Sequence, residues 1–376
     1  MRVYLDNAAT TALDPQVLDA MMPYLTEHFG NASSIHKHGR ETRSAIEIAR
    51  KKIADLLHTT AAEIFFTSGG TEADNTAIIG AVEKNNIRHI ITSKLEHHAV
   101  LHTIAFLEKI NKVQVSYVHT DDKGVIDLHH LEKLLKIHPN SLLSLMHGNN
   151  EIGNMLDLNA VGELCTKYRS LFHSDTVQTM GHYPLHVYKL PVHFLAGSAH
   201  KFHGPKGIGL LYIKSGTAIY PYMHGGAQER NMRGGTENTA AIVGMAKALE
   251  LAYDRMDADR KHIEGLKKRM IDGLNEKIPG ILFNGTSSDM SSSLMHVLNV
   301  SLPPSDKNEM LVMNLDIANI SASAGSACTS GTNIGSHVLE AIGAKNDWGY
   351  VRFSFGRNNT EDEIDYCMNT LVKSIN

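Results

Sequence analysis

Short apolar segments alternate with longer segments of helical period between residues 64 and 213 of this chain. The apolar segments have the length of strands, and turn residues such as Gly69 and Gly70 separate them from the helical segments. Strands that alternate with helices form βαβ units, whose strands run parallel in one sheet. The pattern therefore predicts an α/β fold with a mostly parallel sheet. The predicted strands are Ile64–Phe66, His89–Thr92, Val113–Val118, Leu142–Met146, Leu171–Phe172, Val192–Ala196 and Ile208–Ile213.

The last third of the chain has a different pattern. Helices are predicted from Thr239 to Tyr253 and from Asp257 to Lys277, and shorter strands then mix with helices. At 376 residues, the chain is also long for a single hydrophobic core. We therefore expect residues 16–255 to form a large domain and residues 256–376 a smaller α+β domain. Residues 1–15 are expected to be an N-terminal segment that packs with the small domain.

Composition and charge exclude several classes of protein. A net charge of −4 and a pI near 6.6 leave no basic footprint for nucleic acid or for an anionic membrane. No apolar run approaches the ~20 residues of a membrane span, and no basic stretch followed by an apolar one marks a secretory leader. Three cysteines cannot all pair, nor can they form a four-thiolate zinc site. We expect a cytoplasmic protein without a metal site.

Two neighbouring predicted strands end in residues of opposite charge. Asp175 follows the apolar Leu171-Phe172, and Lys201 lies in a Ser-Ala-His-Lys loop after the strand that ends at Ala196. Ligands of open α/β sheets collect at the carboxyl ends of strands. A carboxylate and a lysine at that edge suit pyridoxal phosphate, which needs a lysine for its aldehyde and an acid for its ring nitrogen. Taken alone, a pair of this kind is more often a structural acid and a surface lysine.

Three further polar loops follow predicted strands. The glycine-rich segment SGGTEADN, residues 68–75, precedes a helix and is a candidate phosphate cradle, although such turns are often only turns. HGNNEIG, residues 147–153, offers an amide at Asn150 for a hydroxyl or a carboxylate, or serves as an Asx turn. KLEHHAV, residues 94–100, offers an imidazole for stacking or proton transfer. His97 is the better candidate because His98 already belongs to the following helix.

The three cysteines fall into two groups. Cys165 and Cys367 each lie on an apolar helix face with i, i+3, i+4 and i+7 spacing, which is typical of buried and inert thiols. Cys328 lies in SASAGSACTSGTNIGS, residues 321–336, among glycines and small polar residues. No periodicity there buries the thiol. An exposed thiol in a loop that can move is a candidate nucleophile, and a loop cysteine without a role is the alternative.

Taken in order, these segments resemble the NifS/IscS-type cysteine desulfurases. That family consists of pyridoxal-phosphate enzymes of fold-type I in the class-V aminotransferase group. The resemblance covers nearly the whole chain and rests on ten strings in the same order. They are YLDNAATT, FGNASSIH, FTSGGTEADN, EHHAV, HGNNEIG, SDTVQ, SAHKFHGPKGIG, MHGGAQERNMRGGTEN, GSACTS and RFSFGR.

The resemblance implies a role for each matching residue. The fold would be a large domain with a mostly parallel seven-stranded sheet and a smaller α+β domain. Lys201 would bind the cofactor aldehyde, Asp175 would pair with the ring nitrogen, and Cys328 would accept the sulfur. The other implied residues are His97 stacked on the ring; Asn150 and Gln178 at the cofactor hydroxyl; Gly70, Thr71, Ser198 and His200 at the phosphate; Thr236 reaching the phosphate of a second subunit; and Arg357, with Asn150, at the substrate carboxylate.

The reaction implied is the conversion of L-cysteine to L-alanine, with Lys201 and His97 moving protons and a persulfide forming on Cys328. A homodimer and a sulfur-acceptor protein, either an iron–sulfur scaffold or a sulfur carrier, are the implied partners. The resemblance allows an iron–sulfur cluster at Cys328 only in a complex with such a scaffold. Neither nucleic acid nor a membrane is an implied partner.

Alternatives to this activity stay open. Within the same fold they are a selenocysteine or cystine lyase or another class-V aminotransferase, although the long loop around Cys328 fits the lyases less well. From another class, the alternative is a catalytically silent regulatory or binding paralogue, which would be expected to lack Lys201, Asp175 or Cys328. Small departures from the family pattern are Ala199, where many relatives have Gly, and Gly70, where many have Ala.

Overall fold

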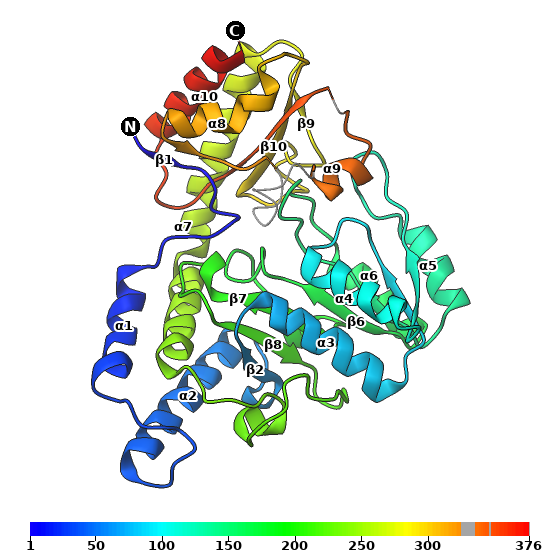
Figure 1. The fold of residues 1–376 in the computed structure, drawn as a ribbon, viewed down its shortest axis with the longest axis vertical. Helices are drawn as coiled ribbons and strands as arrows, with labels where there is room; N and C mark the ends of the chain where they lie inside the picture. The colour runs from blue at the N-terminus through cyan, green and yellow to red at the C-terminus, as the bar shows by residue number, and fades with distance from the viewer. Residues whose placement is uncertain (325–334, 346, 376) are drawn as a thin grey trace.

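The computed structural model describes residues 1–324, 335–345 and 347–375. Seven strands of this described part form a central sheet (Figure 1). In spatial order they are β2 (Ile64–Thr67), β8 (Gly209–Ile213), β7 (Phe194–Ser198), β6 (Leu171–Asp175), β5 (Leu142–Ser144), β3 (His89–Thr92) and β4 (Gln114–Tyr117). β8 runs antiparallel to both of its neighbours, and the other adjacent pairs are parallel. The predicted α/β fold with a mostly parallel sheet is confirmed.

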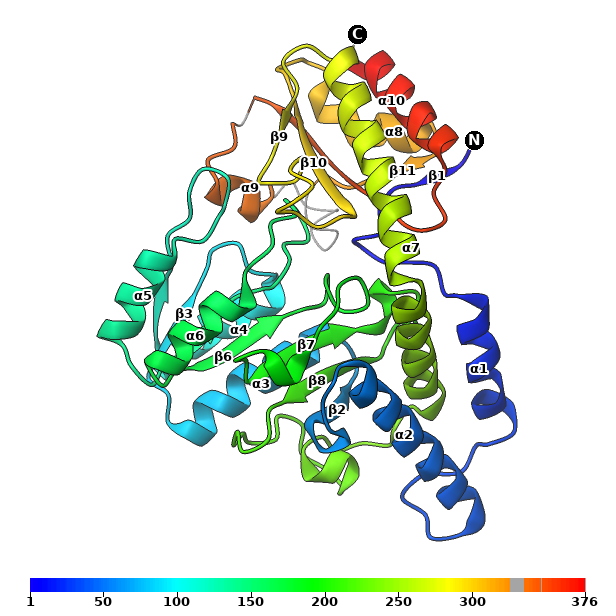
Figure 2. The same ribbon diagram turned by 180° about the vertical axis from the view of Figure 1, so that it is seen from behind.

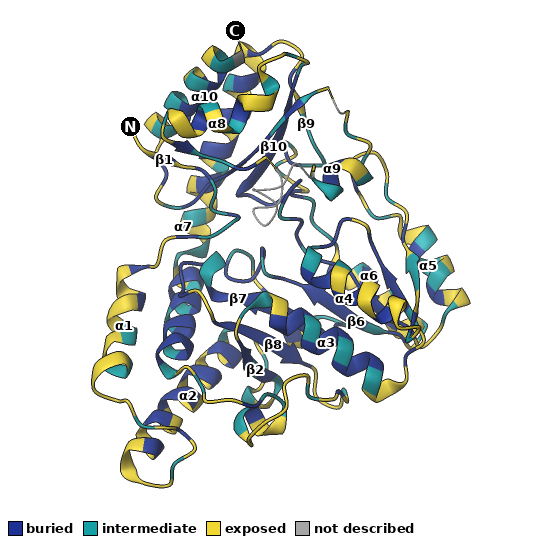
Figure 3. Ribbon diagram, viewed as in Figure 1, coloured by how far each residue is buried: buried dark blue, intermediate teal, exposed yellow. Residues whose placement is uncertain are grey.

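Helices cover both faces of this sheet. Successive side chains of a strand point to opposite faces, and in most of these strands apolar side chains on both faces are buried by helices. On β7, Phe194 and Ala196 belong to one hydrophobic cluster and Leu195 belongs to another. The strands other than the edge strand β4 are accordingly largely buried between layers of helices (Figure 3). The first cluster is completed by α3 (Gly70–Asn85) and α4 (His98–Lys109), and the second by α2 (Lys37–Leu56), α5 (Leu128–Ile137), α6 (Leu158–Lys167) and the first half of α7 (Thr239–Lys277).

α7 is one continuous helix of 39 residues. The prediction of two helices, with a break between Tyr253 and Asp257, is wrong. No proline or glycine interrupts those positions, and the charged residues there are compatible with an exposed helix turn. The first half of α7 packs against the central sheet, while Ile263 and Leu274 in its second half pack in a separate cluster. No helix in the described part of the chain combines the length and the apolar character needed to cross a membrane.

That separate cluster belongs to a second, smaller layer of structure. β10 (Val297–Leu302) lies between β9 (Leu282–Phe283) and β12 (Gly349–Ser354) in an antiparallel sheet, flanked by α7, α8 (Leu311–Ile317) and α10 (Glu361–Ile375). The N-terminal β1 (Val3–Tyr4) pairs with β11 (Ile320–Ser321) and buries Val3 and Leu5 in the same cluster. α1 (Pro15–Thr26) then packs along α7. Figure 2 shows α7 running from one part of the molecule into the other.

Candidate active site

A cavity of about 210 Å³ opens at the carboxyl ends of the parallel strands. Nine of the residues predicted from the sequence border it, together with Asp74, Arg352, Ala8 and a few others that the sequence reasoning did not select. The nine are Gly70, Thr71, His97, Asn150, Asp175, Gln178, Ser198, His200 and Lys201. They come from five different strand ends, and the parallel arrangement brings them together at one edge of the sheet.

Asp175 and Lys201 occupy neighbouring strand ends. Asp175 is the last residue of β6, which pairs with β7, and Lys201 closes a turn of 3-10 helix directly after β7. The Asp175 carboxylate accepts a hydrogen bond from the Val177 backbone N–H at 2.8 Å. The Lys201 ammonium donates to the backbone carbonyls of Ala8 at 2.6 Å and Ala9 at 2.8 Å. The N-terminal segment thus closes one side of the cavity over the lysine.

Asp175 belongs to a group of buried acids. Burial raises its pKa to about 6, against the opposing effects of the Val177 hydrogen bond and the Lys201 charge. Burial likewise raises the pKa of Glu96 to about 8 and that of Asp74 well above its ordinary value. Asp74 lies 3.2 Å from His173 Nε2, but without hydrogen-bond alignment, and burial keeps that imidazole neutral by lowering its pKa to about 3. A cation bound beside Asp175 would relieve this accumulation of buried acids.

Another part of the cavity lining is suited to a phosphate. Gly70 and Thr71 are the first residues of α3, so their backbone N–H groups are not used within the helix. Ser198 at the end of β7 and His200 border the same space. Burial lowers the pKa of His200 to about 4, and its Nδ1 lies 3.1 Å from Thr10 Oγ1. A neutral imidazole and free N–H groups bind an anion by hydrogen bonds.

His97 is the N-cap of α4, which begins at His98 as the sequence predicts. Its Nδ1 accepts a hydrogen bond from the Ala99 backbone N–H at 3.1 Å, so the neutral ring carries its hydrogen on Nε2. Burial is the main cause that lowers the pKa of His97 to about 4, and the Lys201 charge adds to it. A ring that is neutral near pH 7 favours the predicted stacking role over proton transfer.

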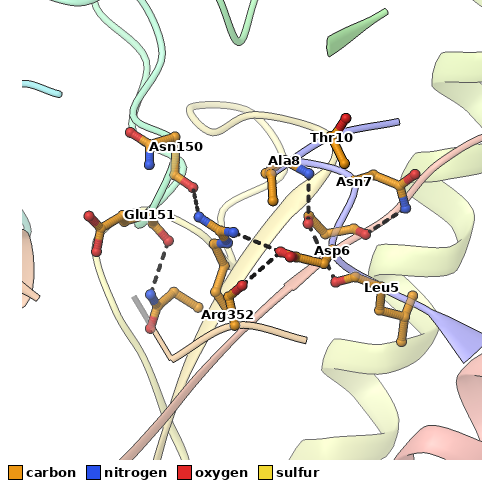
Figure 4. A network of polar contacts seen from close by, with 12 residues as sticks. Leu5, Asp6, Asn7, Ala8, Thr10, Asn150, Glu151 and Arg352 are labelled. Carbon is orange, nitrogen blue, oxygen red and sulfur yellow. Dashed lines mark hydrogen bonds and ion pairs between the residues drawn. The ribbon is translucent and has the colours of Figure 1, made fainter. Parts of the chain in front are cut away.

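The two arginines of RFSFGR lie in different places. Arg357 forms an ion pair with Asp14 and borders a neighbouring cavity, with His203 and Asp259, instead of the one at Lys201. Arg352 borders the cavity at Lys201 and is 1% exposed. Its guanidinium donates to the Asn150 carbonyl at 2.9 Å and to Asp6 Oδ1 at 2.8 Å (Figure 4).

The sequence did contain a signal for Arg352. In β12, Arg352 lies between the apolar residues Val351 and Phe353, which face the core. Because side chains alternate along a strand, Arg352 must lie on the opposite face of that sheet. The Arg352 Nε is buried and has no hydrogen-bond partner within the described part of the chain. A buried donor of this kind is available to an anionic ligand.

Besides Arg357, two predicted residues are not among those that border the cavity. Thr236 is exposed, on the segment between the 3-10 turn Gln228–Asn231 and α7. Cys328 lies outside the residues that the structure describes. The other two cysteines, Cys165 and Cys367, are buried and free, as their helical spacing predicts.

The sequence profile of the family described as Aminotransferase class-V matches residues 3–367. The chain belongs to the class-V aminotransferase family. Similar members include "Cysteine desulfurase IscS" of Clostridium botulinum, which is 43% identical over 100% of this chain and 94% of the relative. The protein of the same name from Methanosarcina thermophila is 44% identical over 99% of this chain and 92% of the relative.

Two solved structures have the same fold. A NifS-like protein superposes with a TM-score of 0.91 at 37% identity, covering 99% of each chain. SspA in complex with cysteine superposes with a TM-score of 0.82 at 31% identity, covering 96% of this chain and 100% of the other. Each similarity extends over both the central sheet and the smaller layer of structure.

Class-V aminotransferases use pyridoxal phosphate, and the residues present in this member fit that group. Lys201 supplies an amine at the cavity, and the buried Asp175 supplies an acid whose charged form a cationic ring nitrogen would stabilise. The first turn of α3 and Ser198 supply donors for a phosphate. A catalytically silent paralogue would be expected to lack Lys201, Asp175 or Cys328, and all three are present in the sequence.

Proposed function

We propose that this chain is a pyridoxal-phosphate-dependent cysteine desulfurase that converts L-cysteine to L-alanine and passes the sulfur to an acceptor protein. The observation that carries the proposal is one cavity bordered by Asp175, Lys201 and Arg352. A lysine and an acid suit the cofactor, and a second, permanent cation suits an amino-acid carboxylate. The names of the relatives from Clostridium botulinum and Methanosarcina thermophila support the choice of substrate and reaction.

The proposed cofactor contacts follow from the lining of the cavity. Lys201 would hold the aldehyde carbon, Asp175 the ring nitrogen, and His97 one face of the ring. Gln178 and Asn150 would lie at the hydroxyl, and the phosphate would contact Gly70, Thr71, Ser198 and His200. When bound, pyridoxal phosphate supplies an electron-accepting ring that weakens the bonds at the substrate α-carbon.

For the substrate carboxylate we propose Arg352 in place of Arg357. Arg352 borders the cavity and has a buried Nε without a partner in the described part of the chain. Its bonds to Asn150 and Asp6 hold the guanidinium plane in one orientation. Arg357 pairs with Asp14 in the neighbouring cavity, where we assign it a structural role.

The proposed chemistry of the chain's own groups is a proton transfer and a sulfur transfer. Lys201 Nζ, released from the Ala8 and Ala9 carbonyls, takes the proton from the substrate α-carbon. The Cys328 thiolate then attacks the substrate sulfur; an S–S bond forms, the Cβ–S bond breaks, and its electron pair stays on the carbon. Protonation of that carbon and return of the proton to the α-carbon give alanine, and Cys328 carries a persulfide. One L-cysteine and one thiol thus give one alanine and one persulfide.

A homodimer is part of the proposal. Exposed apolar side chains gather around α1 and the segment that follows it, including Leu25, Phe29 and Ile35, of which Ile35 is 90% exposed. Covering them with a second subunit removes this area from water. Thr236 is exposed, as a residue that reaches a second subunit's cofactor phosphate must be. We propose a cytoplasmic location, because Cys328 must be a free thiol before it reacts, and a reducing compartment keeps cysteines unpaired.

We also propose the domain division near residue 255. The apolar residues of α7 change from one hydrophobic cluster to another between Ala252 and Ile263, which supports a boundary in that stretch. Residues 1–15 would belong with the small domain, because Val3 and Leu5 pack in its cluster.

Two variants test the function. Lys201→Ala should remove the covalently bound cofactor and its absorbance; a normal cofactor spectrum in this variant would contradict the assignment of the lysine. Cys328→Ser should keep the cofactor but release no sulfide from L-cysteine, with Cys165→Ser as the matched control that keeps the activity. Near-normal sulfide release from Cys328→Ser would favour a lyase or an aminotransferase, which activity on selenocysteine and on keto acids would then identify.

A further inference from the structure

Gln178 borders the cavity, and both polar ends of its side chain are held by the protein. Its Nε2 donates to the Ala8 carbonyl at 3.0 Å, and its Oε1 lies 3.0 Å from His296 Nε2. A carbonyl oxygen only accepts, so the amide nitrogen must be the end that faces Ala8. The amide oxygen must then face His296, and His296 Nε2 must be the donor. The second N–H of the amide makes no hydrogen bond within the described residues and remains for a ligand.

His296 comes from a distant part of the chain. It directly precedes β10 in the smaller layer of structure, 118 positions after Gln178, and it is 2% exposed. Its ring stacks on His182, with centroids 4.7 Å apart and planes 28° apart. The His182 Nε2 in turn donates to the Lys201 backbone carbonyl at 3.0 Å. Two stacked imidazoles thus connect the Gln178 amide with the backbone of the lysine.

The surroundings of His296 allow only one protonation state at low cost. Its Nδ1 is buried and has no hydrogen-bond partner within the described part of the chain. A hydrogen placed on Nδ1 would be an unpaired buried donor, which costs about 1–3 kcal/mol. Burial lowers the pKa of His296 well below its ordinary value, so the ring is neutral and its single hydrogen lies on Nε2. The ring is therefore a fixed donor toward Gln178.

We propose that His296 is a positioning residue, which holds the Gln178 amide with its N–H toward the cavity so that it can donate to the cofactor hydroxyl. This inference rests on the proposed function, because it assumes that pyridoxal phosphate occupies the cavity. His296 does not border that cavity itself, so it acts through Gln178. Without the His296 donor, only the Ala8 carbonyl still orients the amide, so its N–H is held less firmly toward the cofactor oxygen.

The test measures cofactor retention by the full-length holoenzyme. His296→Leu removes the donor, whereas His296→Gln ends in an amide N–H that reaches the position of Nε2. The bound fraction is measured by equilibrium dialysis against graded pyridoxal phosphate, and the absorbance spectrum of the bound cofactor is recorded. We expect a dissociation constant about tenfold higher for His296→Leu and within about twofold of the wild type for His296→Gln, since a single hydrogen bond is at stake.

A double-mutant comparison separates positioning from a general structural effect. In the Gln178→Ala background, His296→Leu should change the dissociation constant by less than about twofold, because the group it positions is absent. If His296→Leu fails to fold, His296→Asn replaces it, because its amide is too short to reach Gln178 but stays polar.

Unchanged retention in His296→Leu, or an equal loss with and without Gln178, would overturn the positioning role while leaving the proposed function intact. A wild-type protein that retains no pyridoxal phosphate would overturn both.

Discussion

Glu96 makes the stability of this protein depend on pH in an unusual direction. Its side chain is buried, and Oε1 accepts from Ser93 Oγ and from the Met146 N–H, each at 3.0 Å. Oε2 has no partner within the described residues. Burial raises the pKa of this carboxyl from 4.5 to about 8. The folded protein therefore keeps this proton at pH values where the unfolded chain has released it.

The sign and size of the effect follow from proton linkage. Between pH 4.5 and about pH 8 the unfolded state binds fewer protons at this position, so the free energy of unfolding falls as pH rises. The slope is about 1.4 kcal/mol per pH unit, and the whole window amounts to about 5 kcal/mol. Glu96→Gln removes the titration. The amide oxygen of this variant can still accept from Ser93 and Met146. The amide N–H that replaces Oε2 is an unpaired donor, and its cost in free energy does not change with pH.

The assay is urea unfolding at pH 6 and pH 8, at fixed protein concentration and saturating pyridoxal phosphate. From pH 6 to pH 8 the wild type should lose about 2–3 kcal/mol relative to Glu96→Gln, because other titrating groups are common to both proteins. Glu72→Gln is the matched control: its hydrogen bonds to Arg233 and Ser68 lower the pKa of that carboxyl against the effect of burial, so its contribution is lost only in acid. An equal pH dependence in the wild type and in Glu96→Gln would refute the reasoning.

Three further predictions concern other residues. Arg352→Lys should raise the KM for L-cysteine at least about tenfold because it removes the planar fork, while Arg357→Lys should leave it within about twofold; the reverse result in steady-state kinetics would restore Arg357. Glu229→Ala should lower the free energy of unfolding by about 3–5 kcal/mol, because the buried Arg50 loses the two hydrogen bonds of 2.7 and 2.8 Å that Glu229 accepts from it. The exposed pair Lys268–Asp272 is its control, and Lys268→Ala should cost below about 0.5 kcal/mol in the same urea melts. Cys165 and Cys367, whose burial raises the pKa of each thiol, should react with a thiol reagent only after unfolding; mass spectrometry that found either one labelled in the native protein would contradict their burial.

Local sequence determined the central sheet and most of the cavity. Strand and helix period are set by neighbouring residues, and the carboxyl ends of parallel strands must meet at one edge. Asp175, Lys201 and His97 could therefore be selected from their positions after predicted strands. Their roles, and the nucleophile at Cys328, came from the resemblance of whole strings to one family. A single carboxylate or lysine would have been compatible with many structures.

Tertiary structure decided which arginine reaches the cavity and that α7 continues without a break. Arg352 and Arg357 are five positions apart in one motif, and only the direction in which β12 enters the molecule separates their surroundings. α7 continues past Tyr253 because the apolar residues of its second half pack in another hydrophobic cluster. The contact between His296 and Gln178 joins residues 118 positions apart. Local propensity does not encode such a contact, because it depends on where two separately folded layers meet.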